Sequence, residues 1–511
     1  MRKKTRLKAH REVHSHTHQN KPFISIKVLS WLVAFVFLII YFPVFMARDA
    51  LWDGTIISYA WHSKDKLIFS TWFDESGWPL VRWLYEIIYE FCLALGLNFQ
   101  FTNNFIIAAL VGLSGYEIYR LATGTYKFDK HSSLFGVLFF FLIPVSTLYV
   151  SSLAFIQLAL FIYLCLFGTR LYLEGVKVPL AILLIALSFQ HNSNPCLLFA
   201  LIVLAYIFGD RKHLKKDALI LFLLACWYLI FKVSFPPYGL YKGYNEISLG
   251  NIFNSKLYVH YLDFFATAYP TLLVVSALLM FKARHTVKPI LIFWFLAMIS
   301  QFPYIVVGKT FQIRQFVDIG SWNYRFTINS SVIIALIFIF LLSVIKKSNV
   351  SILWKRALNF SLGLALLLNA IYTAYGYKQR ATDFVYQDSI IKAFGQNKDA
   401  FKVGYVAIDN VNYFYYPLTH YEMNYYLYRA FGEKRLELFP SSQGVERTPQ
   451  YRSKYILLDA PPQCVYGISL NSNLQDISML DKIAYLYSFR SDLESNLKFS
   501  ARMTHQKCDG L

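Results

Sequence analysis

Long runs of apolar residues dominate the first three quarters of the chain. They cover residues 24–46, 102–119, 132–150, 152–170, 178–191, 195–209, 217–235, 264–281, 288–307, 327–345 and 357–376. A helix needs about 20 mostly apolar residues to cross the hydrocarbon core of a bilayer. The pattern therefore predicts an all-α polytopic membrane protein, in which the short run at 178–191 either tilts or forms a bent pair with the next.

A twelfth apolar segment, residues 80–97, decides the topology. It carries Arg82, Glu86 and Glu90, and a helix that faces lipid rarely accepts three ionisable groups. If this segment lies on the outer surface, all the basic connections fall on one side, and they hold 23 Lys and Arg residues. Because cytoplasmic loops are the ones rich in these residues, we expect about eleven spans, with the N-terminus in the cytoplasm and the C-terminus outside.

Composition narrows the class of protein further. Of the 511 residues, 56% are apolar and only 16% are charged, which excludes a single soluble globule and a disordered chain. The net charge of +20 lies mostly in the short connections between apolar runs, since residues 377–511 are nearly neutral. That distribution indicates orientation in a membrane and no nucleic-acid partner. Ionisable groups are scarce within the spans, which disfavours a pump or transporter.

The same patterns divide the chain into three parts. We expect a basic cytoplasmic tail at 1–22, a transmembrane domain at 23–376 and a small extracytoplasmic α/β domain at 377–511. The first outer loop, residues 47–101, belongs to the transmembrane domain. Its many Trp and Tyr residues favour the membrane–water interface, so two segments, about 53–67 and 80–97, are predicted as interfacial helices.

The C-terminal part has a different sequence pattern. Runs rich in β-branched residues predict strands at 401–409 and 454–459, and residues 422–431 read as a helix that ends at Gly432. Cys464 and Cys508 are the cysteines of this part. They can pair in an oxidising compartment, and the sequence leaves open whether they do.

Acidic residues of the first outer loop are the candidates for catalysis. Asp53 lies seven residues beyond Met46, close to the membrane plane. A carboxylate there can act as a general base or hold a divalent cation, or it can simply cap a helix. Asp49 is the second candidate. Asp74 and Glu75 precede the short motif Gly77-Trp78-Pro79-Leu80. Together with Trp78 they either contact substrate, or they only cap a helix end and face solvent.

These features together resemble a known family. The first apolar helix, the long outer loop with an early aspartate, the interfacial helices and the Gly-x-Pro-Leu step at 77–80 resemble the GT-C superfamily of integral-membrane glycosyltransferases. The resemblance is to bacterial enzymes that decorate O-antigen of lipopolysaccharide and similar envelope glycans, glucosyltransferases included. It implies a polyprenyl-phosphate-linked sugar as donor and places the catalytic carboxylate at Asp53. Many members carry two adjacent acidic residues there, whereas Gly54 follows Asp53 here.

Basic residues elsewhere at the outer face fit a phosphate carrier. Lys309 and Arg325 flank the outer loop 308–326, and Arg82 follows the step at 77–80. Arg can engage two phosphate oxygens at once, although both Lys and Arg also reach toward lipid headgroups. His191, in the turn Phe189-Gln190-His191-Asn192-Ser193-Asn194-Pro195, either binds the donor phosphate, orients Asp53 or is a solvated turn residue.

The sequence therefore predicts a glycosyltransferase that moves a sugar from a polyprenyl-phosphate donor to an envelope glycan or glycolipid on the outer side of the inner membrane. A metal is not required by any motif, and a divalent cation stays an open alternative. One rival is an O-antigen polymerase or ligase, which typically works from a large loop late in the chain, whereas here the large loop is early. The others are a lipid-linked glycan transporter or flippase, and a family member that serves only as a scaffold.

Overall fold

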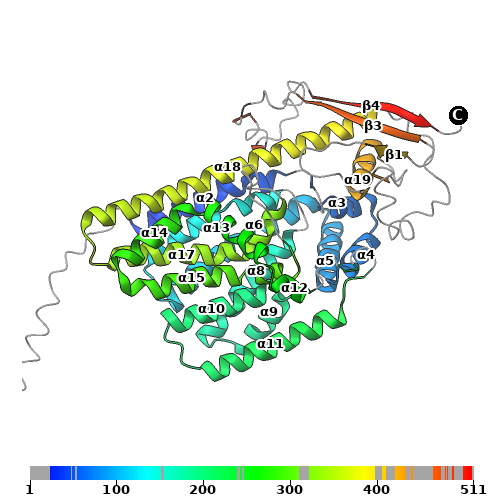
Figure 1. The fold of residues 1–511 in the computed structure, drawn as a ribbon. Coiled ribbons are helices and arrows are strands. Elements are labelled where there is room, and N and C mark those ends of the chain that lie inside the picture. The colour runs from blue at the N-terminus through cyan, green and yellow to red at the C-terminus, as the bar shows by residue number, and fades with distance from the viewer. Residues whose placement is uncertain are drawn as a thin grey trace, which may run out of the picture.

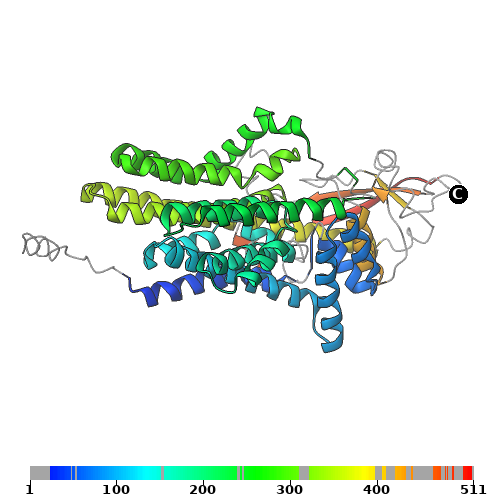
Figure 2. The ribbon, with the colours of Figure 1, turned by 90° about the horizontal axis from the view of Figure 1, so that it is seen from below.

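The computed structural model describes residues 24–47, 49–51, 54–150, 155–238, 242–243, 247–309, 322–396, 406–409, 420–432, 439–440, 464–472, 478, 480–481, 486–487 and 499–508. Asp53 and the predicted strand at 454–459 lie outside these residues. Both ribbon views show bundle helices that run side by side, with short blue helices and a small sheet gathered at the end where the C-terminus lies (Figures 1 and 2).

Helices of membrane-spanning length form the bundle. Among the described residues, six are long and apolar enough to cross a membrane: α2 (Ile26–Met46), α6 (Phe99–Arg120, continued by a π-helical turn to Thr125), α8 (Ile156–Glu174), α11 (Leu214–Ser234), α17 (Ile328–Lys347, preceded by a 3-10 turn, Trp322–Thr327) and α18 (Ile352–Gln396). The chain is therefore a multi-pass helical membrane protein.

Two bent pairs raise the number of candidate spans to as many as eight in the described part of the chain. They are α7 (Lys130–Phe141) with η2 (Pro144–Val150), bent by 49°, and α13 (Ser255–Ala268) with α14 (Pro270–Lys282), bent by 91°. The other apolar runs form shorter helices, which are α9 (Val178–Ser188), α10 (Asn194–Phe208), α15 (Val287–Ile299) and α16 (Phe302–Val306). Four-residue α12 (Leu249–Ile252) precedes α13. The count of eleven spans stays a prediction.

The bundle has two chemically distinct ends. At the first, which we call the basic end, a ring nitrogen of His131 lies 3.1 Å from the Ile24 carbonyl oxygen, and Lys346 pairs with Asp129 at 3.3 Å. At the other, the loop end, the Asn104 side chain at the start of α6 donates to the Ala47 carbonyl oxygen just after α2, at 3.1 Å. The chain thus leaves the bundle after α2 and re-enters it at the same end.

Three short helices lie between these two points. They are α3 (Gly54–Ser63), α4 (Leu67–Glu75) and α5 (Pro79–Leu95). The helix predicted over about 53–67 corresponds to α3, but it ends earlier, at Ser63, because the backbone at Lys64 adopts a left-handed φ of 54° before α4 begins. The predicted helix at 80–97 corresponds to α5, and Gly96, with a φ of 63°, ends it.

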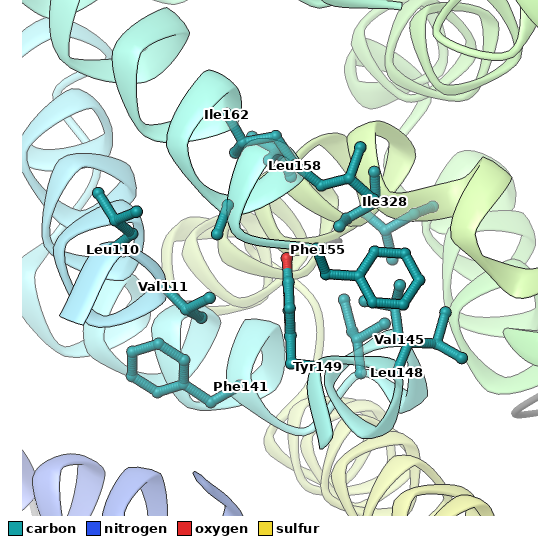
Figure 3. Packing of buried hydrophobic residues seen from close by; sticks show 14 of the residues in the cluster. Leu110, Val111, Phe141, Val145, Leu148, Tyr149, Phe155, Leu158, Ile162 and Ile328 are labelled. Atoms are coloured by element: carbon teal, nitrogen blue, oxygen red, sulfur yellow. The ribbon is translucent and has the colours of Figure 1, made fainter. Parts of the chain in front are cut away.

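The core of the bundle is built around α17, which is buried on almost every side. A helix that is apolar all round is typical of a fully enclosed position. Close approach of α7 to α17 requires Gly136, where a Cβ atom would lie 2.0 Å from the side chain of Ile339. Near the loop end, Phe155, Val145 and Ile328 pack together beside Tyr149 (Figure 3).

The C-terminal part is joined to the bundle by α18. This helix of 45 residues continues past residue 376, where the sequence pattern placed the domain boundary, and the Tyr377 hydroxyl donates to the Ile40 carbonyl oxygen of α2. Beyond it lie a helix, α19 (His420–Phe431), and the strands β1 (Val406–Asp409), β2 (Phe439–Pro440), β3 (Cys464–Ser472) and β4 (Phe499–Cys508).

The strands form one sheet in the order β2-β1-β3-β4. β1 is parallel to β2 and β3, whereas β3 and β4 are antiparallel. β1 corresponds to the end of the strand expected at 401–409, and α19 corresponds to the helix expected at 422–431, with Gly432 at a φ of 73° after it. The long hairpin partners β3 and β4 were not predicted, and their register sets Cys464 opposite Cys508.

Candidate functional site

A buried polar turn between α9 and α10 lies at the centre of the candidate site. Asn194 at its end is fully buried, and its side-chain amide donates to the carbonyl oxygens of Phe161, at 2.9 Å, and Ser188, at 2.8 Å. The Asn329 amide of α17 donates to the Asn194 side-chain oxygen at 2.8 Å. Since Phe161 is five residues into α8, the turn is recessed into the bundle by roughly 7 Å along that helix.

His191 occupies this turn and contacts a second element. One ring nitrogen lies 3.0 Å from the Ser193 hydroxyl, and the other lies 3.3 Å from the Tyr304 hydroxyl of α16. Burial lowers the pKa of His191 to about 4; the contact with Asn194 opposes the shift and the charge of Lys232 adds to it. The imidazole is therefore neutral near pH 7, with one nitrogen as donor and the other as acceptor.

Two cations adjoin the His191–Tyr304 pair. The Lys309 backbone N–H donates to the Tyr304 carbonyl oxygen at 2.8 Å, and the Tyr261 hydroxyl of α13 donates to the Lys309 carbonyl oxygen at 2.8 Å. Burial, and then the nearby charge of Arg325, lower the pKa of Lys309. The Arg325 guanidinium lies 4.9 Å from the Phe326 ring centre, and that ring lies 4.9 Å from the Tyr304 ring.

Tyr304, which sequence reasoning did not select, thus links the three predicted residues: its hydroxyl contacts His191, its carbonyl oxygen accepts from the Lys309 backbone, and its ring packs on Phe326, the neighbour of Arg325. Two neighbouring positive charges favour the binding of an anion between them. The site combines the Tyr304 hydroxyl, the neutral His191 imidazole and two cations. Such a set suits a ligand that has a phosphate group and other hydrogen-bonding groups. These contacts come from the turn between α9 and α10, from α13 and α16, and from the 3-10 turn before α17, so no local sequence motif links them.

Arg82 has different partners. Its guanidinium pairs with Asp74 at 2.7 Å and with Glu86 at 2.9 Å. Within the described ranges, neither of these ion pairs involves His191, Lys309 or Arg325. The structure therefore places Arg82 in a local ion-pair group of the first outer loop.

The segment before α5 is fixed to the end of α11. The backbone N–H of Tyr238 donates to the carbonyl oxygen of Glu75, a buried residue, at 2.9 Å. Gly77 adopts a φ of +76°, and a Cβ atom there would lie 2.6 Å from the Phe235 carbonyl oxygen, so only glycine fits. Half-buried Trp78 follows at the start of α5. This contact joins the first outer loop to the helix that approaches His191.

Asp49 is held by the C-terminal part. Both carboxylate oxygens are engaged, one by the Ala50 backbone N–H at 2.8 Å and by the Tyr425 hydroxyl, and the other by Arg429 of α19. Burial, and then the charge of Arg429, lower the pKa of the neighbouring His62. Asp49 therefore anchors α19 to the first outer loop, four residues before Asp53.

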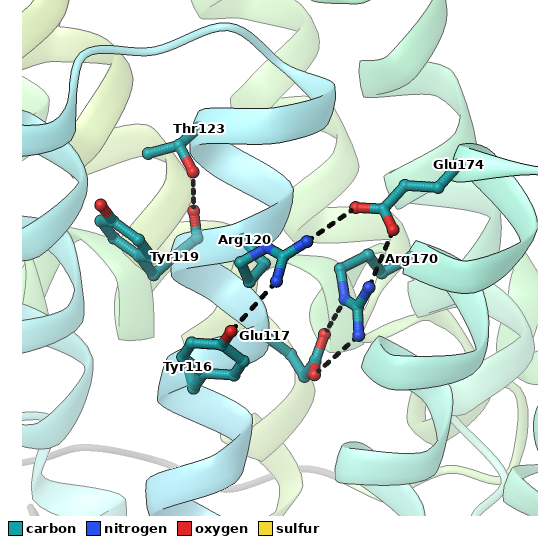
Figure 4. A network of polar contacts seen from close by, with 7 residues as sticks. All are labelled: Tyr116, Glu117, Tyr119, Arg120, Thr123, Arg170 and Glu174. Atoms are coloured by element: carbon teal, nitrogen blue, oxygen red, sulfur yellow. Dashed lines mark hydrogen bonds and ion pairs between the residues drawn. The ribbon is translucent and has the colours of Figure 1, made fainter. Parts of the chain in front are cut away.

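The basic end contains a contrasting charge network (Figure 4). Arg170 of α8 pairs with Glu117 of α6, and their side chains are only 10% and 4% exposed. Arg170 also pairs with Glu174 at 2.8 Å, and Glu174 lies 3.5 Å from Arg120. A second buried pair joins Arg211 to Asp217. These charges neutralise one another and leave no need for a ligand.

Metal binding has little support in the described part of the chain. No group of three or more His, Cys, Asp or Glu side chains gathers there. A divalent cation at Asp53 stays an untested prediction.

Sequence reasoning missed Tyr304, Asn194, Asn329 and Lys232. The available signal was weak: each is a polar residue at the end of an apolar run, where polar residues are common for reasons of solvation alone. Only their convergence in the fold separates them from ordinary helix-end residues.

The fold and the site define a class of protein, a multi-pass helical membrane protein with a recessed polar site at one end of the bundle. No protein-family model matches the chain, and no curated protein matches it. Among solved structures, the chain is similar to the crystal structure of ArnT from Cupriavidus metallidurans in the apo state. The two share 11% sequence identity with a TM-score of 0.43, over 86% of this chain and 92% of that chain.

Proposed function

We propose that this chain is an integral-membrane glycosyltransferase of the bacterial inner membrane. It would take a sugar from a polyprenyl-phosphate donor and transfer it to an envelope glycan or glycolipid on the outer face, with eleven spans, a cytoplasmic N-terminus and an extracytoplasmic C-terminal part. The observation that supports this best is the pair of cations, Lys309 and Arg325, beside His191 and Tyr304 at the loop end of an apolar bundle.

The carrier suits this arrangement because its two halves have opposite solubility. The polyprenyl chain stays in lipid, while its phosphate needs cations and hydrogen-bond donors near the membrane plane. Lys309 and Arg325 supply positive charge, and neutral His191 supplies one ring N–H. A recessed turn keeps these donors away from bulk water, which strengthens each interaction.

The transfer itself is a displacement at the anomeric carbon of the sugar. In our proposal Asp53 removes the proton from the acceptor hydroxyl, whose oxygen forms the new glycosidic bond. The bond between the anomeric carbon and the phosphate oxygen breaks, and the phosphate leaves with the electron pair. Lys309 and Arg325 stabilise the charge that develops on that phosphate. Inversion at the anomeric carbon is implied by the GT-C resemblance.

The two aspartates receive different roles. Asp49 already accepts hydrogen bonds on both carboxylate oxygens, so we assign it to anchoring the loop and assign Asp53 to proton transfer. Asp74, Glu75 and Trp78 stay candidates for acceptor contact, because their segment is fixed to α11 beside the polar turn.

The test is sugar transfer by the purified full-length chain, with radiolabelled polyprenyl-phosphate sugars as donors. We expect Asp53→Asn to lower kcat by about 100-fold or more, as removal of a general base does. Lys309→Met and Arg325→Met should raise the donor KM and lower kcat, whereas Lys346→Met at the basic end should change neither. Full activity of Asp53→Asn would remove it from catalysis, and unchanged kinetics of both cation variants would refute the proposed site.

A transporter gives a different result in the same preparation. It would move a labelled lipid-linked glycan across reconstituted vesicles without forming a glycosidic bond. That outcome would replace the glycosyltransferase proposal by the flippase alternative.

A further inference from the structure

Lys232 lies where a lipid-facing helix meets the polar turn. Its helix, α11, is the least buried of the six long apolar helices in the described chain. Asp217, Leu224 and Phe231 form its buried stripe, seven residues apart, whereas Val233 is 81% exposed. Lys232 is half-buried between these two faces, one turn after Tyr228. It therefore stands at the border between lipid and protein.

The positive charge of Lys232 has no carboxylate within ion-pair distance among the described residues. Its ammonium instead lies 5.8 Å from the ring centres of both Tyr228 and Phe231. Arg170 and Arg211, which are also largely buried, each have an acidic partner. A cation withdrawn from water is costly unless an anion compensates it, so the position favours an anion that comes from outside the chain.

The neighbours of Lys232 are hydrogen-bonding groups of the recessed turn. The Tyr228 hydroxyl donates to the Asn192 side-chain oxygen at 3.3 Å, and the Trp227 indole donates to the Ala186 carbonyl oxygen at 3.3 Å. These bonds fix the last third of α11 against α9 and the turn. Lys232 is also close enough to His191 for its charge to oppose protonation of that ring. An anion at Lys232 would therefore lie beside the His191–Tyr304 pair.

We propose that Lys232 binds the phosphate of a polyprenyl phosphate that approaches from the lipid, at the lipid-facing border of α11 beside the turn at residues 189–193. The inference rests on the proposed function and adds to it the side of entry and a residue that receives the carrier. A phosphate monoester or diester is the chemistry that Lys232 recognises. Because free phosphate and ordinary anionic lipids share part of this chemistry, the test separates the three.

The experiment measures binding by the full chain in nanodiscs of zwitterionic lipid. The probes are polyprenyl phosphate, phosphatidylglycerol and inorganic phosphate, each followed by native mass spectrometry. Lys232→Met should weaken binding of polyprenyl phosphate by about 10- to 100-fold, the effect of losing one charge-assisted hydrogen bond. Lys232→Arg, which keeps the charge, should restore most of it. Phosphatidylglycerol and inorganic phosphate should bind far more weakly and without dependence on Lys232.

The matched control is Lys282→Met. The Lys282 ammonium also lies over two rings at the end of a helix, 5.2 Å from Phe281 and 4.9 Å from Trp354, but at the basic end. Polyprenyl phosphate binding should not change in this variant. Equal affinities for Lys232→Met and Lys282→Met would overturn the inference. So would equally tight binding of phosphatidylglycerol, which marks a general lipid contact, or of inorganic phosphate, which marks a lipid-independent anion site.

Failure of this inference can be told from failure of the proposed function. If the natural chain binds polyprenyl phosphate through Lys232 but transfers no sugar, the glycosyltransferase proposal fails and the Lys232 site stands. If sugar transfer proceeds with the same donor KM in Lys232→Met, the function stands and the Lys232 site fails. Lys232→Gln serves as the second neutral variant, so that a folding defect of Lys232→Met alone does not decide the result.

Discussion

At the basic end of the bundle, the buried arginines pair with carboxylates of the same chain, whereas the cations around the recessed polar turn lie near aromatic rings, neutral polar groups and one another. Arg170 is neutralised by Glu117 and Glu174. Lys309, by contrast, has the charge of Arg325 nearby, and Lys232 lies over tyrosine and phenylalanine rings. Both ends belong to one helical bundle and contain a similar set of residue types.

The difference shows how a charged cluster can be interpreted. Charges that neutralise one another stabilise the assembly of helices and need nothing further. Charges of one sign that lie close together repel one another, and an anion that binds between them is stabilised. Substitution of a paired, buried arginine or its carboxylate should therefore lower stability, whereas substitution of a cation around the polar turn should lower ligand affinity.

The largest expected effect on stability is at the buried pair of the basic end. Glu117→Gln leaves the Arg170 guanidinium without its closest carboxylate, and removal of one partner of a buried pair costs about 3–5 kcal/mol. The midpoint of thermal unfolding in detergent, followed by tryptophan fluorescence, should fall accordingly. The double variant Glu117→Gln/Arg170→Met should recover most of the loss. A single variant as stable as the natural chain would contradict the structural role of this network.

The next effect concerns His191 and pH. The ring is neutral in the folded chain, with a pKa of about 4, while the unfolded chain binds a proton below about pH 6.5. Stability is therefore complete above pH 6.5 and falls as the pH drops toward 4, by about 2 kcal/mol between pH 7 and pH 5. Unfolding midpoints at both pH values should show this loss in the natural chain and a smaller loss in His191→Gln. Equal losses in both would show that the ring is not buried in its neutral form.

A smaller effect is expected where α19 meets the first outer loop. Arg429→Met removes the cation from Asp49, and because the Arg429 side chain is 35% exposed, we expect a loss of about 1 kcal/mol. Hydrogen exchange should accelerate in residues 420–432 and in residues 54–63 together, because the contact joins both. Arg429→Lys should give a weaker change. Faster hydrogen exchange in α19 alone would show that the Arg429–Asp49 pair does not stabilise residues 54–63.

The smallest effect belongs to the exposed pair Lys346–Asp129. The lysine side chain is 61% exposed, and pairs of this kind contribute about 0–1 kcal/mol. Lys346→Met should leave both the unfolding midpoint and the donor KM almost unchanged. A large change in either would mean that the basic end is not a purely structural cluster, and the comparison between the two ends would no longer hold.

The apolar pattern was sufficient to predict the long helices. The runs at 24–46, 217–235 and 327–345 correspond closely to α2, α11 and α17, because lipid and the bundle core select for the same apolar composition along each helix. The apolar pattern could not predict the end of a helix that continues beyond the apolar core of the bundle. α18 carries buried polar residues such as Gln387 beyond residue 376, so its hydropathy falls although the helix continues.

The site was predictable only in part. His191, Lys309 and Arg325 could be selected because polar groups at the ends of apolar runs are conspicuous. Their common neighbour Tyr304 could not, because it lies 113 residues from His191 in the chain. The partnership of Asp49 with Arg429, 380 residues apart, is likewise set by packing of the finished fold. Asp53 lies outside the described residues, so its role stays a prediction.

The unbroken α18 determines how the protein can be divided. With 45 residues, the helix is about 68 Å long, roughly twice the thickness of the hydrocarbon core. A cut at residue 376 would pass through hydrogen-bonded helix and strip partners from Phe384, Ile390 and Phe394, which are almost fully buried. A chain truncated at residue 376 would therefore lose the last part of α18 together with these buried apolar side chains, and would expose the surfaces that they cover.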